Sequence, residues 1–185
     1  MADLNDHQLM LEVKNGDLDK LGYLFEKHHK RLYNLFLRQT GDTQTSEDLV
    51  QEVFLRMLKY RHTYRGEGRF TTWMFRIAHN VKADFYRRTR REHDFTGEID
   101  DLVSGCPDPG QLAEKTSQLD ALRRAMDRLS DERREVLVLS RFQQLKYEEI
   151  SEILGCPVGT IKARVFHAIR ELKLFFNEQK DGATQ

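Results

Sequence analysis

The sequence predicts an all-α protein made of two small helical domains joined by a flexible acidic linker. Apolar residues recur at helical spacing along most of the 185 residues, and no segment keeps a period of two for long. The interval 92–111 breaks this pattern with two of the three prolines, several glycines and a run of acids. We therefore expect a first domain over 1–91, a linker over 92–111 and a second domain over 112–185.

The individual helices follow from apolar stripes and capping residues. Asn5 or Asp6, Asp17, Ser46 and Ser130 are suitable N-caps, and Gly155 followed by Pro157 ends a helix. The expected helices lie near 5–14, 17–40, 46–60, 70–90, 112–128, 131–143, 147–154 and 158–177.

Composition excludes several classes of protein. Two cysteines, Cys106 and Cys156, are too few for a disulfide scaffold or a four-cysteine zinc site. The N-terminus lacks a basic region followed by an apolar block, and no apolar run approaches the roughly 20 residues that span a bilayer. We expect a cytoplasmic protein with no metal, no cofactor and no enzymatic activity.

Charge is distributed unevenly although the chain as a whole is neutral. Residues 56–91 hold eleven basic and two acidic side chains, whereas residues 92–120 hold one basic and eight acidic ones. A strongly basic block predicts a polyanionic partner, although a solvated helix face has the same composition. The acidic interval is expected to lie against the basic block and to compete with phosphates.

The segment 147–173 has the pattern of a helix-turn-helix. A short helix ends at Gly155, and a second helix carries an apolar stripe on one side and small, polar and cationic residues on the other. Such a second helix lies in the major groove of DNA. The residues expected on this DNA-binding face are Val158, Gly159, Thr160, Lys162, Ala163, Arg164, His167 and Arg170. An αα-hairpin that packs internally is the alternative.

The helix expected from Phe70 carries aromatic residues among cations on its outer face. Phe75 and Tyr86 lie there with Arg76, and aromatic rings beside cations suit unpaired bases. The preceding loop has two glycines between two arginines, and Glu67 within it can accept from a base amino group. Packing of both rings against a neighbouring helix is the alternative.

The helix expected over 46–60 places a leucine on its polar side. Leu55 lies there among Asp48, Gln51 and Glu52, which predicts a protein-docking patch with an apolar centre and a polar rim. A leucine held at the edge of a helix–helix contact is equally compatible with the pattern.

Three segments together resemble a known family. They are DLVQEVFLRMLK at 48–59, YRGEGRFTTWMFRIAHNVKADFYRRTRR at 64–91 and the helix-turn-helix YEEISEILGCPVGTIKARVFHAIREL. Their order and spacing are similar to those of the extracytoplasmic-function class of bacterial sigma-70 factors. The resemblance covers about 25–172 and implies a transcription initiation factor that binds core RNA polymerase and promoter DNA, with an anti-sigma factor as a further partner.

The resemblance also implies a division of labour between the two domains. The first domain would bind core polymerase and melt the −10 element, and the second would read the −35 element as duplex. Docking on the coiled coil of the largest polymerase subunit is implied for Asp48, Gln51, Glu52, Phe54 and Leu55. Recognition of the −10 element is implied for Tyr64, Arg65, Glu67, Arg69, Phe70, Thr72, Trp73, Phe75, Arg76, His79, Asn80, Lys82, Tyr86, Arg87 and Arg90.

Two other functions compete with this interpretation. A stand-alone helix-turn-helix regulator would leave the basic, aromatic first domain without a role. The second is an enzyme, for example a metal-dependent hydrolase that uses His28, His29 or His79 with nearby carboxylates. The sequence has no paired carboxylates at catalytic spacing, no nucleophile elbow and no phosphate loop to support an enzyme.

Overall fold

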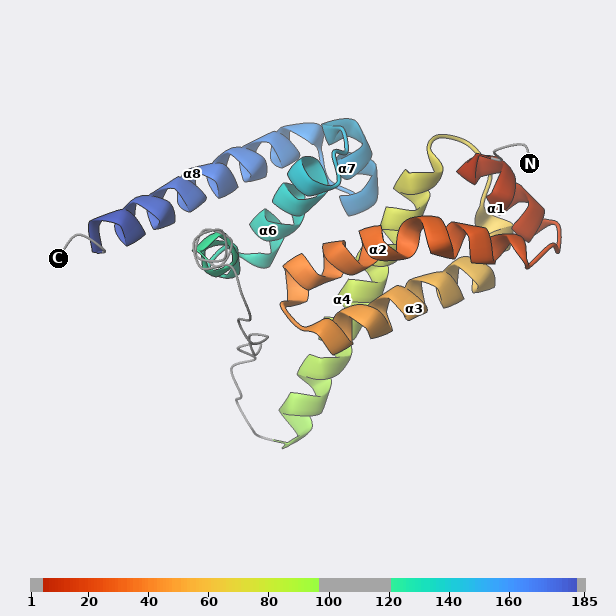
Figure 1. Cartoon of the computed structure of the whole chain (residues 1–185), viewed down its shortest axis with the longest axis horizontal. Helices are drawn as coiled ribbons and strands as arrows, with labels where there is room; N and C mark the ends of the chain where they lie inside the picture. The colour runs from red at the N-terminus through yellow and green to blue at the C-terminus, as the bar shows by residue number, and fades with distance from the viewer. Residues whose placement is uncertain (1–4, 97–120, 183–185) are drawn as a thin grey trace, which may run out of the picture.

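The computed structural model describes residues 5–96 and 121–182 and contains two packed groups of helices (Figure 1). Every regular element in these ranges is helical, which confirms the predicted all-α class. Most of the predicted linker, 92–111, lies outside the described residues, as do six of the eight acids in the interval expected to cover the basic block.

The first group contains α1 to α4. Its elements are α1 (Asp6–Lys14), α2 (Lys20–Thr40), α3 (Thr43–Lys59), a short 3-10 turn η1 (Arg61–Thr63) and α4 (Phe70–Thr96). Helix α3 lies between α2 and α4 and contacts both. The centre of the group is formed by fully buried side chains: Met10, Val13, Leu24, Leu32, Phe36, Val53, Met57 and Met74.

Local chemistry explains where these helices begin and end. Asn5 and Gln8 form a reciprocal capping box at the start of α1, as predicted from Asn5. Gly41 closes α2 in the left-handed conformation at φ 73°. The predicted start of α3 at Ser46 is wrong, because Asp42 is the N-cap and its carboxylate accepts from the Thr45 amide at 2.6 Å.

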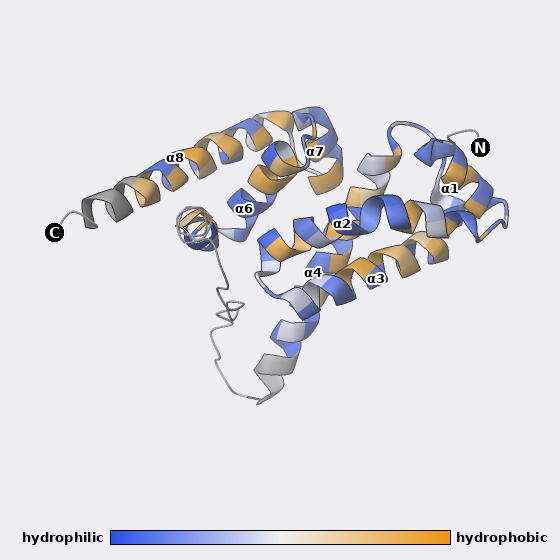
Figure 2. Ribbon diagram, viewed as in Figure 1, coloured by the Kyte–Doolittle hydropathy of each residue, from blue (hydrophilic) through white to orange (hydrophobic). Residues whose placement is uncertain are grey.

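The second group follows residue 121. Residues 121–127 are helical, followed by α6 (Asp131–Leu137), the π-helical segment η2 (Val138–Phe142), α7 (Tyr147–Leu154) and α8 (Val158–Gly182). Gly155 at φ 65° caps α7 and lets α8 follow almost at once, as the sequence predicted. The apolar stripes of these helices face inward, and the polar stripes face outward (Figure 2).

The single helix predicted over 131–143 is interrupted in the structure. After Leu137 the backbone widens into η2, and the Gln143 amide donates to the Val138 carbonyl at 3.0 Å. Gln144 then adopts φ 56°, an uncommon conformation for a residue with a side chain. This segment faces α2, and the two groups share one continuous apolar cluster.

Candidate nucleic-acid interfaces and docking surface

Helix α8 presents the predicted DNA-binding face to solvent. Ile161, Val165 and Ala168 are buried on the side of α8 that contacts α6 and α7, so the opposite side faces outward. Gly159, Lys162, Ala163, Phe166, His167 and Arg170 are exposed on that side, and Phe166 is 63% exposed. The predicted orientation of the helix is confirmed, and the alternative in which this face packs internally is excluded. DNA contact by these residues stays a prediction.

Three of the predicted DNA-binding residues near the start of α8 are less exposed to solvent than the others. Val158 and Thr160 are half-buried in its first turn. Arg164 pairs with Glu132 of α6 at 2.8 Å and approaches the Cys156 sulfur at 3.9 Å. Arg164 therefore also joins α8 to α6, and Cys156 is a half-buried residue with a free thiol.

Helix α3 exposes the predicted docking patch. Leu55 is 62% exposed, which excludes the alternative in which it is held between helices. Asp48 and Gln51 are exposed beside it. The prediction for Phe54 needs correction: this side chain is 6% exposed and makes an edge contact with Phe25, with ring centroids 4.9 Å apart.

Glu52 is half-buried because it has a structural partner. Its carboxylate accepts from the Arg56 Nε at 2.7 Å, and Arg56 also pairs with Asp84 of α4 at 2.5 Å. Burial alone would lower the pKa of Arg56, but the hydrogen bonds that it donates to these two carboxylates raise it above its usual range. The Arg56–Asp84 pair therefore joins α3 to α4, and Glu52 holds the Arg56 side chain from within α3.

The loop before α4 is open to solvent at the predicted positions. Arg65, Glu67 and Arg69 are exposed, and Gly66 and Gly68 have φ of 74° and 78°. A Cβ at Gly66 would lie only 2.4 Å from Cε1 of His7, so a side chain there would push the His7 ring aside.

Two aromatic residues predicted to contact DNA belong to the core of the first group. Tyr64 is 2% exposed, and its hydroxyl is hydrogen-bonded to Nδ1 of His7 at 2.9 Å. Phe70 is 4% exposed and packs against Tyr64 and the half-buried Trp73. The interpretation of Tyr64 and Phe70 as base-contacting residues is corrected, because their rings position the loop from beneath.

The outer face of α4 is only partly open. Arg76, Asn80, Arg87 and Arg90 are exposed, as the sequence predicted. Phe75, Thr72 and Lys82 are buried and His79 and Tyr86 are half-buried, so these five predicted DNA-binding residues do not lie open to solvent in this structure. For Phe75, the alternative of packing within the protein is the one that the structure adopts.

The cover over this face comes from the second group of helices. Glu135 of α6 lies 2.9 Å from Nδ1 of His79 and 2.9 Å from Nζ of Lys82. Glu149 of α7 pairs with Arg69 at 3.3 Å. Burial alone would raise the pKa of Glu135, but the hydrogen bond from His79 and the charge of Lys82 hold it below its usual range. Burial also raises the pKa of Tyr86.

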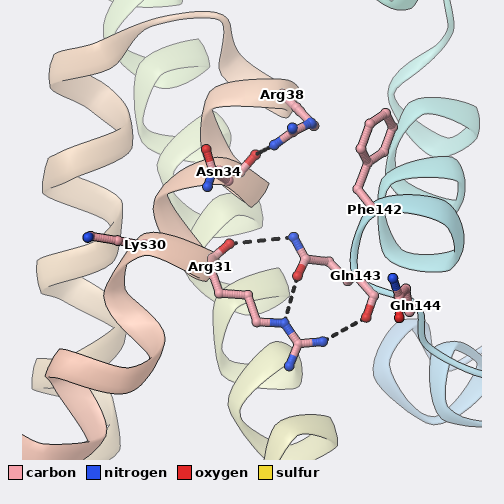
Figure 3. Close-up of a pocket in the computed structure, with 7 residues that line it drawn as sticks. All are labelled: Lys30, Arg31, Asn34, Arg38, Phe142, Gln143 and Gln144. Carbon is pink, nitrogen blue, oxygen red and sulfur yellow. Dashed lines mark hydrogen bonds between the residues drawn. The ribbon is translucent and has the colours of Figure 1, made fainter.

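A second contact joins α2 to η2 beside a polar hollow of about 540 Å³ (Figure 3). The Arg31 guanidinium donates to the Gln143 side chain at 2.8 Å and to its backbone carbonyl at 2.7 Å. Arg31 also lies over the Phe75 ring, 4.9 Å from its centroid, and Arg38 lies over Phe142 at 4.5 Å.

These bridging residues carry no signal that sequence reasoning could use. The Arg31–Gln143 and His79–Glu135 pairs join positions 112 and 56 residues apart. No local pattern in the sequence identifies such partners.

The adjacent histidines His28 and His29 have hydrogen-bond partners within the first helical group. His28 pairs with Asp6 at 2.9 Å, and the neighbouring His29 hydrogen-bonds the Phe25 carbonyl at 2.9 Å. Among the described residues, no cluster of three or more metal-ligating side chains occurs. Within the same ranges, no helix combines the length and apolar character needed to cross a bilayer.

Comparison with protein families identifies both groups of helices. Residues 24–92 match the model of sigma-70 region 2, and residues 119–172 match the model of sigma-70 region 4. The RNA polymerase sigma factor YlaC of Bacillus subtilis is 32% identical over 158 residues, which cover 84% of this chain and 91% of the relative. The ECF RNA polymerase sigma factor SigW of the same organism is 28% identical over 169 residues, covering 86% and 90%.

Two solved structures share the fold. CnrH in complex with the cytosolic domain of CnrY matches with a TM-score of 0.70 and 22% identity, covering 94% of this chain and 97% of that chain. The sigma factor RpoE of Bartonella quintana, in complex with the anti-sigma factor NepR, matches with a TM-score of 0.68 and 24% identity, covering 84% and 96%.

Proposed function

This chain belongs to the extracytoplasmic-function class of the sigma-70 family of RNA polymerase sigma factors, and on that premise we propose how its surfaces divide the work of initiation. The first domain, expected over 1–91, binds core polymerase and the −10 element. The second domain, expected over 112–185, binds the −35 element. The observation that carries this proposal is the presence of two outward surfaces, the Leu55 patch and the α8 face, on separate helical groups.

The proposed −35 reader is the outer face of α8. Small residues at Gly159 and Ala163 allow the helix to approach base edges, and Lys162 and Arg170 are exposed cations beside them. The exposed Phe166 ring adds an apolar surface suited to a thymine methyl group. This arrangement supports binding of the duplex in its major groove.

The proposed −10 surface is the Arg65–Arg69 loop together with the outer face of α4. Arg65, Arg69 and Arg76 are exposed and suit the backbone of a single strand. Tyr86, half-buried in this structure, is the ring proposed to stack on an unpaired base.

The proposed polymerase contact is the Leu55 patch, with Asp48 and Gln51 on its rim and Phe54 and Glu52 supporting it from beneath. The coiled coil of the largest polymerase subunit is its expected partner, and the flap of the second-largest subunit is expected to hold the second helical group. Two structures with the same fold were solved with a bound partner, which supports an anti-sigma factor as a further partner. We expect the protein to act in the cytoplasm, by binding and without catalysis.

Transcription in vitro tests this function. The chain is added to core polymerase on genomic DNA, and transcript starts are mapped. We expect starts that share −10 and −35 elements and depend on the chain, whereas starts unchanged by its omission would contradict the proposal.

A comparison of matched and pre-opened promoters tests the division between the two surfaces. Tyr86→Ala is expected to lose stacking of about 1–3 kcal/mol per base on matched templates and to be rescued when the −10 region is already mismatched. Lys162→Ala acts on duplex and is expected to be impaired on both templates alike. Equal rescue of both variants would contradict the proposed division.

A further inference from the structure

The proposed function gives no role to α1, yet this helix packs against the segment that carries the Arg65–Arg69 loop. Residues 24–92 match the region 2 model, so α1 (Asp6–Lys14) lies before the matched segment. It contacts η1 and α4, the two elements on either side of the loop (Figure 1). What α1 does is therefore inferred from its contacts with that segment.

Two polar side chains of α1 hold Tyr64, the residue that leads into the loop, at both of its ends. Nδ1 of His7 is hydrogen-bonded to the Tyr64 hydroxyl at 2.9 Å, and the Lys14 ammonium donates to the Tyr64 backbone carbonyl at 2.7 Å. Because Tyr64 is 2% exposed, loss of either partner leaves a buried polar group unpaired, which costs more than loss of a hydrogen bond at the surface.

The backbone directly after Tyr64 also fits closely against α1. Gly66 has a positive φ of 74°, and a Cβ placed on it would lie 2.4 Å from Cε1 of His7. Gly68 has a φ of 78°, but the corresponding position there has no described atom within 4 Å apart from those of its chain neighbours. The loop is therefore held by α1 at its Gly66 end and is open at its Gly68 end.

The Tyr64 ring connects α1 to the start of α4. It makes edge contacts with Phe70 and Trp73, with ring centroids 6.2 and 5.0 Å away. Phe70 also lies 5.4 Å from the buried ring of His28, whose Nε2 pairs with Asp6 of α1. Helix α1 therefore reaches both ends of the loop, directly at its start and through His28 at its end.

We propose that α1 is a positioning element for the base-reading loop, and that His7 and Lys14 hold the conformation in which Arg65–Arg69 meets an extruded base. This inference rests on the proposed function of the loop in −10 recognition. His7 and Lys14 act through Tyr64 and not by touching DNA. Release of Tyr64 lowers discrimination among bases more than affinity for the strand, because the exposed arginines still attract the backbone.

Conservative substitutions separate these contacts from the fold. Tyr64→Phe removes the hydroxyl that His7 holds and keeps the ring in the core. Lys14→Met removes the ammonium group, and Lys14→Arg restores a cationic donor. Lys30→Met is the matched control, because Lys30 is exposed on α2 and its change removes the same single charge as Lys14→Met.

Limited trypsin digestion of the full chain measures how firmly the loop is held, since trypsin cleaves after Arg65 and Arg69. We expect cleavage at these sites to be at least about threefold faster in Tyr64→Phe and Lys14→Met, because local opening controls the rate. Lys30→Met and Lys14→Arg are expected to behave as the unmodified chain. Cleavage after Arg87 and thermal unfolding followed by circular dichroism check that the rest of each variant is folded.

Base discrimination is measured on the complex with core polymerase. The probes are non-template single strands that carry the −10 sequence found by start-site mapping, each compared with a strand that has an abasic site at one position. We expect Tyr64→Phe and Lys14→Met to lose about tenfold in discrimination at one position and to keep their affinity for the abasic strand. His7→Ala is expected to add no further loss in the Tyr64→Phe background, because both changes remove the same hydrogen bond.

The proposal is overturned if loop cleavage is unchanged in Tyr64→Phe and Lys14→Met. It is also overturned if these variants bind the natural and the abasic strands with equally reduced affinity, which is the result of a purely structural role. Absence of discrimination at every position by the unmodified chain contradicts the proposed −10 function of the loop. Intact discrimination in all variants contradicts positioning by α1 alone.

Discussion

The two nucleic-acid surfaces of this molecule differ in what faces them. On α8, Lys162, His167 and Arg170 point to solvent, whereas on α4 His79 and Lys82 point to the carboxylate of Glu135. Both surfaces combine cations with small or aromatic residues, so composition does not separate them. The difference shows that a basic helix face is available to DNA only where the rest of the chain supplies no competing anion.

The largest effect on folding is expected at the covered face. Lys82→Ala leaves the buried carboxylate of Glu135 with its hydrogen bond to His79 and without its lysine partner, and we expect a loss of about 3 kcal/mol in the free energy of unfolding. Arg87→Ala, on the exposed part of the same helix, is expected to change stability by less than about 0.5 kcal/mol. Urea denaturation of both variants measures the contrast. Equal losses of unfolding free energy in the two variants would show that the covered and the open part of α4 contribute equally to folding stability.

At the exposed Leu55 patch we expect a substitution to weaken binding to core polymerase and to change folding stability little. Leu55→Asp places a charge at the centre of the proposed polymerase contact, and we expect a loss of about 2 kcal/mol or more in core binding. Thermal unfolding is expected to change little, because Leu55 is 62% exposed. Co-purification with core polymerase, beside a melting curve, tests this. A fall in melting temperature that parallels the loss of binding would place Leu55 in the fold of the monomer.

The open face of α8 gives a smaller and salt-dependent effect. Arg170→Ala removes an exposed cation, and we expect duplex −35 binding to weaken by about 1 kcal/mol, with a salt slope reduced by about one if the contact is to phosphate. The same loss is expected in the Glu135→Gln background, because Glu135 pairs with α4 and Arg170 is exposed on α8. A loss that appears only after Glu135→Gln would show that α8 is covered while Glu135 is paired.

The smallest expected effect is the pH dependence of the contact between Glu135 and the pair His79 and Lys82, called the closed contact. His79 and Lys82 hold the pKa of Glu135 below its ordinary value of 4.5, so proton binding is weaker when the closed contact is formed than when it is broken. The closed contact is therefore complete above about pH 4.5 and is lost as the pH falls through the lowered pKa.

Unfolding free energies of the unmodified chain and of Glu135→Gln, compared across this acid range, isolate that effect. The gap between them is expected to narrow as the pH falls, whereas a constant gap would contradict the role given to the Glu135 charge.

The elements with local signals were the ones that the sequence predicted well. Gly155 and Pro157 mark the turn of the helix-turn-helix, and the period of 3.6 residues correctly oriented α8. The exposed Leu55 was likewise visible as an apolar residue on a polar helix face. In each case the decisive neighbours lie within a few residues along the chain.

The features that the sequence did not predict depend on distant partners or on backbone detail. The burial of Phe75 depends on packing within the folded chain, where Arg31 of α2 covers its ring. The π-helical segment Val138–Phe142 keeps apolar residues at helical spacing. The sequence therefore predicts one uninterrupted helix over 131–143. The burial of Tyr64 depends on His7, which lies 57 residues away in the sequence. No local pattern shows this contact, so the sequence predicts Tyr64 as part of a DNA-binding loop.

Carbodiimide cross-linking of the free chain tests the central claim most directly, because this reagent joins an amine to a carboxylate only when they are in contact. We predict a cross-link between Lys82 and Glu135, whose atoms lie 2.9 Å apart. The cross-link between Lys27 and Asp6, 2.7 Å apart within the first helical group, serves as the control. Recovery of the control without the Lys82–Glu135 cross-link in the free chain would contradict the covered state of α4.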